Sequence, residues 1–245
     1  LHRRRHSFPT RRSSDLDFVP SNIGTPDQVA DTPAEWFLLQ DIRTLQVWSV
    51  APSAWGLSAE EGGDYQVAHG QGLSVIRHRR GELAVTAAWC VDAVTAVKQV
   101  RLHLVNHGAR TLHLRVIGLA EWMMGANRSD RSTVHTAQVR QRLPVQRLTA
   151  LLATQRECAG GFGDGTAFLA LAGPDTDGEG EDWTCDRREC FDARGRPVLP
   201  DHFGRQQGIG FDPCAALSSR LTLAGGEQGE RVFLLGYAES PAAAR

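Results

Sequence analysis

The stretch from Tyr65 to Gly125 constrains the fold most, because its apolar and polar residues alternate through several runs separated by turn signals. Val100, Leu102 and Leu104 illustrate the pattern, with a polar or charged residue between each pair. A two-residue period places alternate side chains on one side of a β-strand. The stretch therefore predicts half-buried antiparallel strands joined by short hairpins.

The rest of the chain extends this prediction to an all-β fold. Strands are expected at 36–39, 46–49, 65–69, 83–90, 97–105, 112–116, 166–172, 217–223 and 231–237. Gly70 and Gly72 allow either a bulge or a close backbone approach, and the strand is expected to continue through 73–77. Residues 134–141 alternate weakly, and 147–154 fit either a strand or a short helix. No long helix and no repeat of fixed period is predicted.

Composition limits the classes of function. A chain of 245 residues fits one large β-sandwich, and a net charge of −1 excludes the basic footprint of a nucleic-acid-binding protein. No apolar run reaches the ~18 residues of a membrane helix. Five cysteines without C-x-x-C spacing indicate free thiols in a reducing compartment. Cys185, Cys190 and His202 lack the spacing of a zinc site, so neither a metal nor a cofactor is expected.

Residues 1–16 read LHRRRHSFPTRRSSDL, with five arginines and little apolar content. A disordered basic tail is one interpretation. The part HSFPTRRSSDL resembles the conceptual translation of a sequencing-adapter oligonucleotide, and we favour that interpretation. The segment is therefore expected to have no function, and the domain is expected to span residues 17–240.

Several short motifs follow one another in a fixed order. They are the run Val29–Glu35 followed by Val47–Pro52 (VWSVAP), Tyr65–Gly72 (YQVAHGQG), Leu104–Gly108 (LVNHG), Glu121–Gly125 (EWMMG), Asp186–Glu189 (DRRE) and Gly208–Leu217 (GIGFDPCAAL). Together these motifs resemble the β-sandwich domain of glycoside hydrolase family 94, and DPCAAL resembles the cyclic β-1,2-glucan synthase branch. Departures include Cys190-Phe191-Asp192 after DRRE, where Phe-Leu-Gly is usual, and Cys185 in place of a glycine.

The resemblance implies an antiparallel β-supersandwich of the galactose-mutarotase type, lacking its first strands. It also implies an (α/α)6 barrel, absent here, that carries the catalytic acid of an inverting phosphorolysis, with residues 241–245 beginning the linker to it. No residue of this chain is then expected to be catalytic. The resemblance implies a β-glucan oligosaccharide and the barrel as partners and a homodimer as a possible assembly. It implies a cytoplasmic segment of a bacterial, inner-membrane-anchored parent, with no contact of its own to membrane or nucleic acid.

Twelve residues are candidates for a role in this context. Those that could contact sugar are Trp48, Trp55, His69, Gln71, Glu121 and Trp122. Those that form structural motifs are Asp186, Arg187, Glu189, Asp212, Pro213 and Cys214. Asp186 and Glu189 could pass for an acid/base pair, but a position in a sandwich argues against it, and Arg187 is expected to pair with one of them. For each sugar-contact candidate we favour the structural alternative: a hydrogen-bonded strand histidine, core tryptophans with satisfied N–H groups, and a corner-forming Glu-Trp pair.

Three functional hypotheses remain open from the sequence. The first is a non-catalytic sandwich domain of a cyclic β-1,2-glucan synthase-like or cellobiose-type enzyme. The second is a free-standing carbohydrate-binding module, and the third is a purely structural packing or dimerisation domain. Binding of β-1,2-gluco-oligosaccharides would separate the second from the third.

Overall fold

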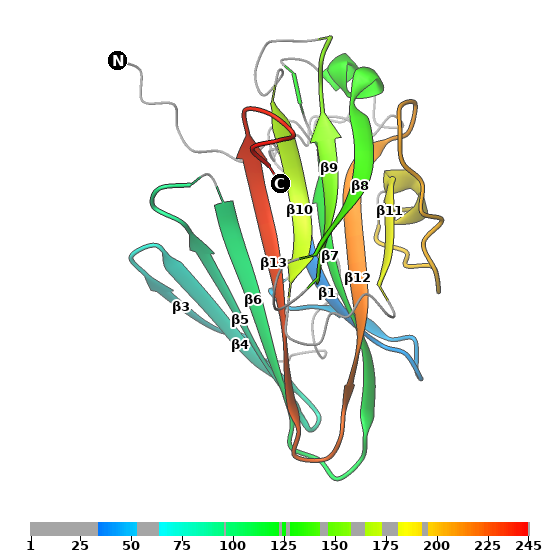
Figure 1. The fold of residues 1–245 in the computed structure, drawn as a ribbon. Helices are drawn as coiled ribbons and strands as arrows, with labels where there is room; N and C mark the ends of the chain where they lie inside the picture. Colours follow the sequence, from blue (N-terminus) through cyan, green and yellow to red (C-terminus); the bar gives the residue numbers. More distant parts are fainter. Residues whose placement is uncertain are drawn as a thin grey trace, which may run out of the picture.

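The structure of the chain is a computed structural model, which describes residues 34–52, 64–95, 97–122, 124–125, 128–142, 147–157, 165–172, 181–192 and 196–244. Within these residues two antiparallel sheets pack face to face (Figure 1). The expectations about residues 1–16, about Trp55 and about the motif start at Val29 lie outside the described residues. Within the described part, no helix has the length and apolar character needed to cross a membrane.

The smaller sheet has five strands in the order β11-β12-β7-β1-β2. Their bounds are Asp182–Asp186 (β11), Pro213–Leu223 (β12), Leu112–Glu121 (β7), Glu35–Asp41 (β1) and Val47–Ser49 (β2). β7 lies at the centre, paired with β1 on one side and β12 on the other. Its residues are buried from Leu114 to Glu121, since both of its faces are covered.

The larger sheet has eight strands in the order β3-β4-β5-β6-β13-β10-β9-β8. Their bounds are Gln66–Gly70 (β3), Leu73–Arg80 (β4), Leu83–Val91 (β5), Val97–Asn106 (β6), Gln228–Ala238 (β13), Thr166–Ala172 (β10), Arg147–Thr154 (β9) and His135–Arg142 (β8). Two short 3₁₀ helices, η2 (Arg128–Thr133) and η3 (Arg187–Glu189), interrupt the strand succession.

The main core lies between the sheets and follows the alternation seen in the sequence. Val100, Leu102 and Leu104 of β6 are fully buried and face the buried side chains of the smaller sheet. Phe233 of β13 packs against Phe37 of β1, with ring centroids 5.4 Å apart. Burial of this apolar area, at about 25 cal/mol per Å², is the principal force holding the two sheets together.

A second apolar cluster covers the outer face of the smaller sheet. Trp36 and Ile117 point away from the main core and pack against Cys190, Phe191 and Phe203. These last three belong to the segment that follows β11 and folds back over the sheet. This cover explains why β7 is buried on both faces, where a two-layer sandwich would leave every second residue exposed.

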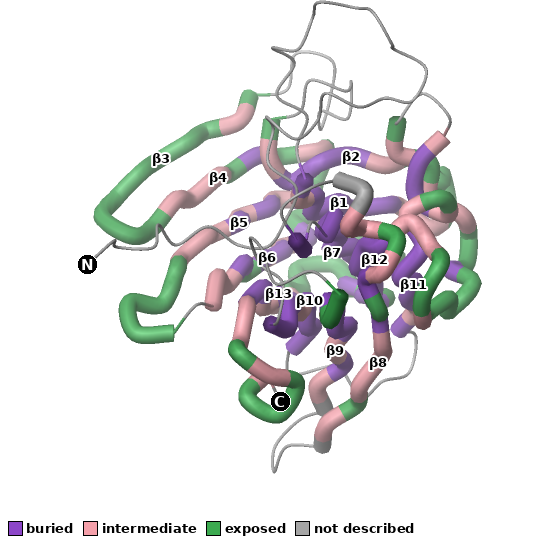
Figure 2. The backbone as a smooth tube through the Cα atoms, turned by 90° about the horizontal axis from the view of Figure 1, so that it is seen from above, coloured by how far each residue is buried: buried purple, intermediate pink, exposed green. Residues whose placement is uncertain are grey.

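Strands β3, β4 and β5 fan away from the rest of the molecule (Figure 1), and β3 is exposed along its length (Figure 2). Val67 and Leu73 leave 47% and 44% of their surface exposed there. The sheet edge at β3 is therefore the least supported part of the described fold.

Two connections switch between the sheets at the same end of the sandwich. β6 passes from the larger sheet to β7 of the smaller, and β12 of the smaller sheet passes to β13 of the larger. The fully buried Asn106 joins the two turns: its Nδ2 donates to the carbonyl oxygens of Arg110, Leu223 and Ala224 at 2.8, 3.1 and 3.0 Å. Its Oδ1 accepts from the Gly108 N–H at 3.0 Å, so the amide is saturated.

Gly118 of β7 lies directly against Phe233 of the opposite sheet, because a Cβ there would lie 2.6 Å from the Phe233 ring. Phe233 is fully buried, so its ring cannot move aside without displacing its neighbours. Gly118→Ala is expected to lower the free energy of unfolding by about 2 kcal/mol through overpacking, as measured by urea denaturation. Gly70→Ala is the control, since its Cβ would meet only the Leu73 carbonyl oxygen at 3.9 Å. Equal stability of the two variants would contradict the steric argument.

The all-β sandwich and its predicted strands are confirmed, and residues 147–154 form a strand. The expectation of one strand that continues through Gly70 and Gly72, with a bulge as one alternative there, is wrong. His69 pairs with Ser74 and Gly70 with Leu73, so Gln71 and Gly72 form a two-residue hairpin turn between separate strands β3 and β4. Gly72 has φ of 72°, the left-handed conformation that such a turn requires and that glycine adopts without strain.

Candidate functional site

Two ends of the sandwich concentrate the residues of interest. Strand β7 connects them, and its ten residues span about 30 Å at ~3.3 Å per residue. The motif end contains Glu121, Arg187 and Asp212. The turn end contains the β1–β2, β4–β5, β6–β7 and β12–β13 connections and a pocket.

At the motif end, four charged groups from distant segments form one network. Glu121, with 1% of its surface exposed, lies 2.9 Å (Oε1) from Nε of Arg187. The Arg187 guanidinium stacks 4.2 Å above the Phe191 ring, and its Nη1 is 4.0 Å from Asp212. Arg131 approaches the other Asp212 oxygen at 2.5 Å. The network thus connects the end of β7, helix η3, the start of β12 and helix η2.

Helix η3 is held by a second set of contacts. Asp186 caps it, accepting the Arg188 backbone N–H at 3.1 Å, and takes the Arg188 guanidinium in a bidentate pair at 2.8–3.0 Å. Glu189 accepts from the Thr184 hydroxyl at 2.9 Å and from the Gly204 N–H at 2.5 Å. The expected ion pair of Arg187 with Asp186 or Glu189 is therefore wrong. The neighbouring Arg188 takes Asp186, because the turn of η3 directs Arg187 toward β7.

The motif residues Pro213 and Cys214 are buried at the start of β12. The Pro213 carbonyl accepts the backbone N–H of Trp122 at 3.2 Å, and Cys214 is paired with Glu121 across the sheet. Burial raises the pKa of the Cys185 thiol to about 12 and raises that of Cys214 as well. These thiols stay protonated, and the described residues contain no His, Cys, Asp and Glu group arranged to hold a metal ion.

The sugar-contact candidates do not lie together. Trp122 is fully buried beside Glu121 at the motif end. His69 and Gln71 belong to the exposed β3–β4 hairpin, where His69 Nδ1 is 2.9 Å from the Ser74 hydroxyl. Trp48 lies at the turn end. The structure therefore separates these residues into three places rather than one site.

Trp48 forms part of a buried stack at the turn end. Its indole N–H donates to Nε2 of His78 at 3.2 Å, while the Arg80 guanidinium lies 4.3 Å over its ring. Arg80 is held there by a 2.6 Å hydrogen bond from Nη2 to Oε1 of Gln46. Tyr65 packs on the other side of His78, with ring centroids 4.8 Å apart. Only 2% of the Trp48 surface is exposed, so its ring faces are covered in this arrangement.

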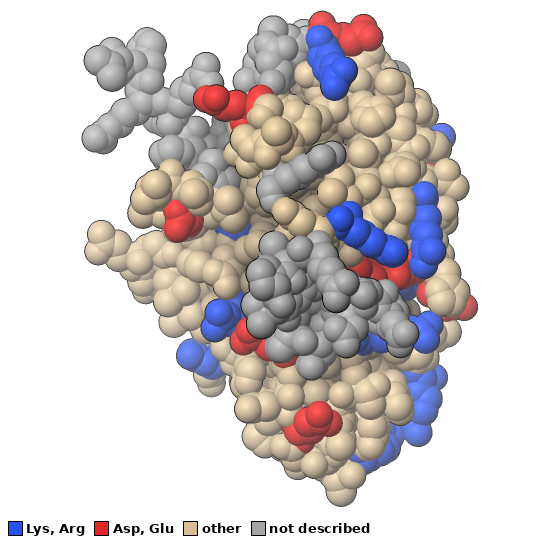
Figure 3. Space-filling model, in the orientation of Figure 1, with Lys and Arg blue, Asp and Glu red and all other residues tan. Residues whose placement is uncertain are grey.

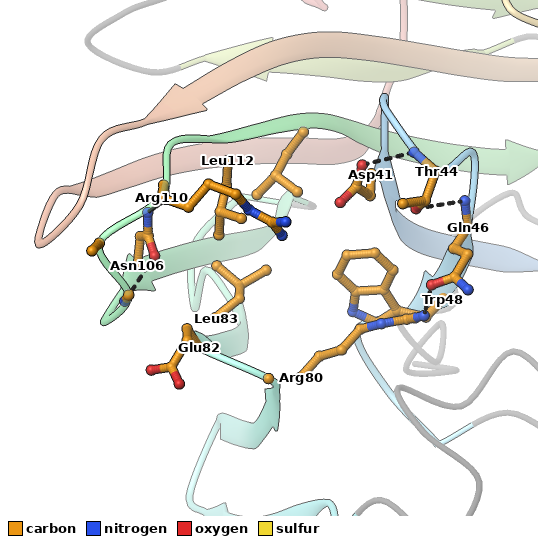
Figure 4. Close-up of a pocket in the computed structure, with 14 residues that line it drawn as sticks. Asp41, Thr44, Gln46, Trp48, Arg80, Glu82, Leu83, Asn106, Arg110 and Leu112 are labelled. Carbon is orange, nitrogen blue, oxygen red and sulfur yellow. Dashed lines mark hydrogen bonds between the residues drawn. The ribbon is translucent and has the colours of Figure 1, made fainter.

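A pocket of about 770 Å³ opens beside this stack (Figure 4). Its floor consists of apolar side chains from three strands, β2, β5 and β7: the buried Trp48, Leu83 and Leu114 and the partly buried Leu112. Charged and polar groups stand around this floor; they include Asp41, Gln46, Arg80, Glu82, Asn106 and Arg110. Sequence reasoning found Trp48 but missed the others, because they come from three separate turns and no spacing along the chain relates them.

His78 gives the turn end a pH dependence. Burial, with a smaller contribution from Arg80, lowers the pKa of His78 to about 4. The unfolded chain has the ordinary pKa of about 6.5, so it binds more protons than the folded state between these values. The contribution of neutral His78 to the free energy of unfolding is therefore fully present above about pH 6.5. This free energy falls by about 3 kcal/mol in all as the pH decreases toward 4.

Urea denaturation at several pH values measures this effect. His78→Gln retains an acceptor for the Trp48 N–H and removes the titrating group, so its stability is expected to fall less steeply between pH 6.5 and 4. Parallel curves for the variant and the parent chain would contradict the assignment.

The sequence of this chain is similar to a family profile and to a curated protein. The family profile described as "Glycosyl hydrolase 94, supersandwich domain" matches residues 24–245. The curated cyclic beta-(1,2)-glucan synthase NdvB of Rhizobium meliloti (strain 1021) is 28% identical over 238 residues, covering 95% of this chain and 8% of that protein. The chain thus spans a small fraction of this relative.

Two solved structures also superpose in part on this chain. A bacterial glucoamylase complexed with acarbose superposes with a TM-score of 0.49 at 9% identity, over 86% of this chain and 27% of that chain. A galactose mutarotase-like protein from Lactobacillus casei ATCC 334 gives a TM-score of 0.44 at 8% identity, over 87% and 88% of the two chains.

Proposed function

The chain belongs to the glycosyl hydrolase 94 supersandwich-domain family, and from this premise we propose that it is the non-catalytic, carbohydrate-binding sandwich domain of a cyclic β-1,2-glucan synthase-like enzyme. Its parent is a glycosyltransferase with a phosphorylase-like module, in which a separate barrel supplies the catalytic acid. The domain binds β-glucan and supports that barrel.

One observation supports the non-catalytic role most directly: the motif carboxylates from Glu121 onward, all within the described residues, are already engaged. Glu121 and Asp212 face arginines, Asp186 holds Arg188, and Glu189 accepts two hydrogen bonds. A catalytic acid must face open space in which a glycosidic oxygen can reach it, whereas these carboxylates are occupied by protein contacts. The arrangement suits a rigid support for the loops at the motif end.

The charge distribution fits a neutral ligand. Figure 3 shows acidic and basic side chains in separate small groups on the face it presents, among mostly uncharged residues. The whole chain carries a net charge of −1. Partners in this proposal are a β-glucan oligosaccharide, the parent's own barrel and a second copy of the domain. The parent is a bacterial, membrane-anchored enzyme with this domain on its cytoplasmic side.

The experiment uses the purified chain with β-1,2-glucan and inorganic phosphate. We expect no release of glucose 1-phosphate, together with saturable binding of β-1,2-gluco-oligosaccharides at millimolar concentration or below. Release of glucose 1-phosphate that is lost in Glu121→Gln or Glu189→Gln would overturn the structural roles assigned to these residues. Its presence in any form would overturn the non-catalytic assignment. Absence of binding would leave a purely structural domain and refute the carbohydrate-binding part.

A further inference from the structure

The pocket at the turn end offers opposed charges that do not neutralise one another directly. Figure 4 shows the Arg110 side chain extending from the β6–β7 turn into the pocket, toward the wall that carries Asp41. The structure shows no ion pair between these two residues. Asp41 uses Oδ1 to accept the backbone N–H groups of Arg43 and Thr44, at 2.8 and 3.0 Å, which fixes its position at the β1–β2 turn.

The remaining charges make the pocket neutral as a whole. Arg80 and Arg110 contribute two positive charges, and Asp41 and Glu82 contribute two negative charges. A simple anion would be attracted by the arginines but repelled by the carboxylates, and a simple cation the reverse. A neutral ligand can bind both walls of the pocket if it donates hydrogen bonds to the carboxylates and accepts hydrogen bonds from the guanidinium groups. Hydroxyl groups can do both.

The floor adds an apolar requirement. Leu83, Leu112 and Leu114 line it, so a ligand needs a face of C–H groups on one side and hydroxyl groups at its edge. A pyranose ring has this form. The volume of about 770 Å³ lies in the range of small-molecule sites and accommodates more than one sugar ring.

We propose that this pocket is a subsite for a gluco-oligosaccharide, which Arg110 and Asp41 hold from opposite walls above the apolar floor. The identity of the sugar as a β-glucan rests on the proposed function, whereas the position of the site rests on the pocket alone. Arg110 and Asp41 are then the specificity-determining residues, because they form charge-assisted hydrogen bonds to the sugar hydroxyls.

The test is a titration of the purified chain with β-1,2-gluco-oligosaccharides, followed by calorimetry and by NMR of the backbone amides. Arg110→Ala is expected to weaken binding about tenfold, the equivalent of one lost charge-assisted hydrogen bond. Asp41→Asn, which retains an acceptor for the turn N–H groups, is expected to weaken it by a similar factor. Amide shifts are expected at residues 41–46 and 106–112.

Arg79→Ala is the matched control. It removes the same charge one residue from Arg80, but Arg79 is exposed and does not line the pocket. Equal losses in Arg79→Ala and Arg110→Ala, or saturable binding with shifts only elsewhere, would overturn the subsite. So would tight binding of inorganic phosphate that displaces the sugar, since it would make the site an anion site.

A β-1,4-linked glucan series separates this inference from the proposed function. Binding of that series alone, with the Arg110→Ala loss preserved, would uphold the pocket and overturn the β-1,2-glucan assignment. Binding of β-1,2-glucan that is unaffected by Arg110→Ala would uphold the proposed function and overturn the pocket.

Discussion

Replacing Glu121 by alanine is expected to lower the free energy of unfolding of the chain by about 3 to 5 kcal/mol. The buried Glu121 carboxylate lies 2.9 Å from the Arg187 guanidinium, whose side chain is only 19% exposed. Removal of one partner leaves the other charge desolvated without its counter-charge, and this costs more than the pair contributes. The loss is to be measured by urea denaturation.

A double-mutant cycle tests the cause. Glu121→Leu combined with Arg187→Met removes both charges and should recover much of the stability that Glu121→Leu alone loses. Glu230→Gln is the control, because Glu230 pairs with Arg101 at 3.8 Å on the surface and should change stability by about 0.5 kcal/mol or less. Strictly additive losses in the cycle would show that the pair is not coupled.

Replacing Asn106 by leucine is the second large effect, with an expected loss of about 3 kcal/mol. Leucine preserves the approximate shape of the side chain but breaks all four hydrogen bonds of the amide, each worth about 1 kcal/mol net. Asn106 joins the β6–β7 and β12–β13 turns, which are in close contact: a Cβ on Gly225 would lie 2.8 Å from the carbonyl oxygens of Gly108 and Ala109. Chemical denaturation measures the loss.

Two further variants define the origin of that loss. Asn106→Asp keeps the acceptor for the Gly108 N–H but directs a carboxylate at three carbonyl oxygens, so it should destabilise at least as much as leucine. Gln228→Ala, at an exposed contact with His103 near the same turns, should leave stability within about 0.5 kcal/mol. A stable Asn106→Asp variant would show that the donor bonds of Asn106 contribute little.

The sandwich itself was predictable because its signal is local. Strands β5, β6 and β7 carry a two-residue period that a single sequence displays, and their turns contain Gly81 and Gly108. β11 was not predicted, since its five residues follow an acidic segment and lack clear alternation. The hairpin at Gly72 was misassigned because a glycine between two apolar runs fits either a bulge or a turn.

The candidate sites were less predictable because they are formed by tertiary contacts. Asp186, Arg187 and Arg188 are consecutive, and nothing in their order shows which arginine takes the near carboxylate and which reaches Glu121, 66 positions away. Arg110 and Asp41 come together because β1 pairs with β7, which brings the β1–β2 and β6–β7 turns to the same end of the smaller sheet. The motifs indicated that Glu121 and Asp212 belong to one family pattern, but not that Arg187 connects them.

The last strand of the chain has a consequence for the order of biosynthesis. β13 lies between β6 and β10, so among the described strands it alone joins the β3–β6 half of the larger sheet to the β8–β10 half. Its partners in β6 precede it by more than 120 residues. A nascent chain cannot complete this sheet until residues 228–238 have left the ribosome, and such long-range pairing slows folding. Until then, the edge strands β6 and β10 of the two half-sheets have backbone N–H and C=O groups without their β13 partners. Chaperones protect such exposed edges during translation.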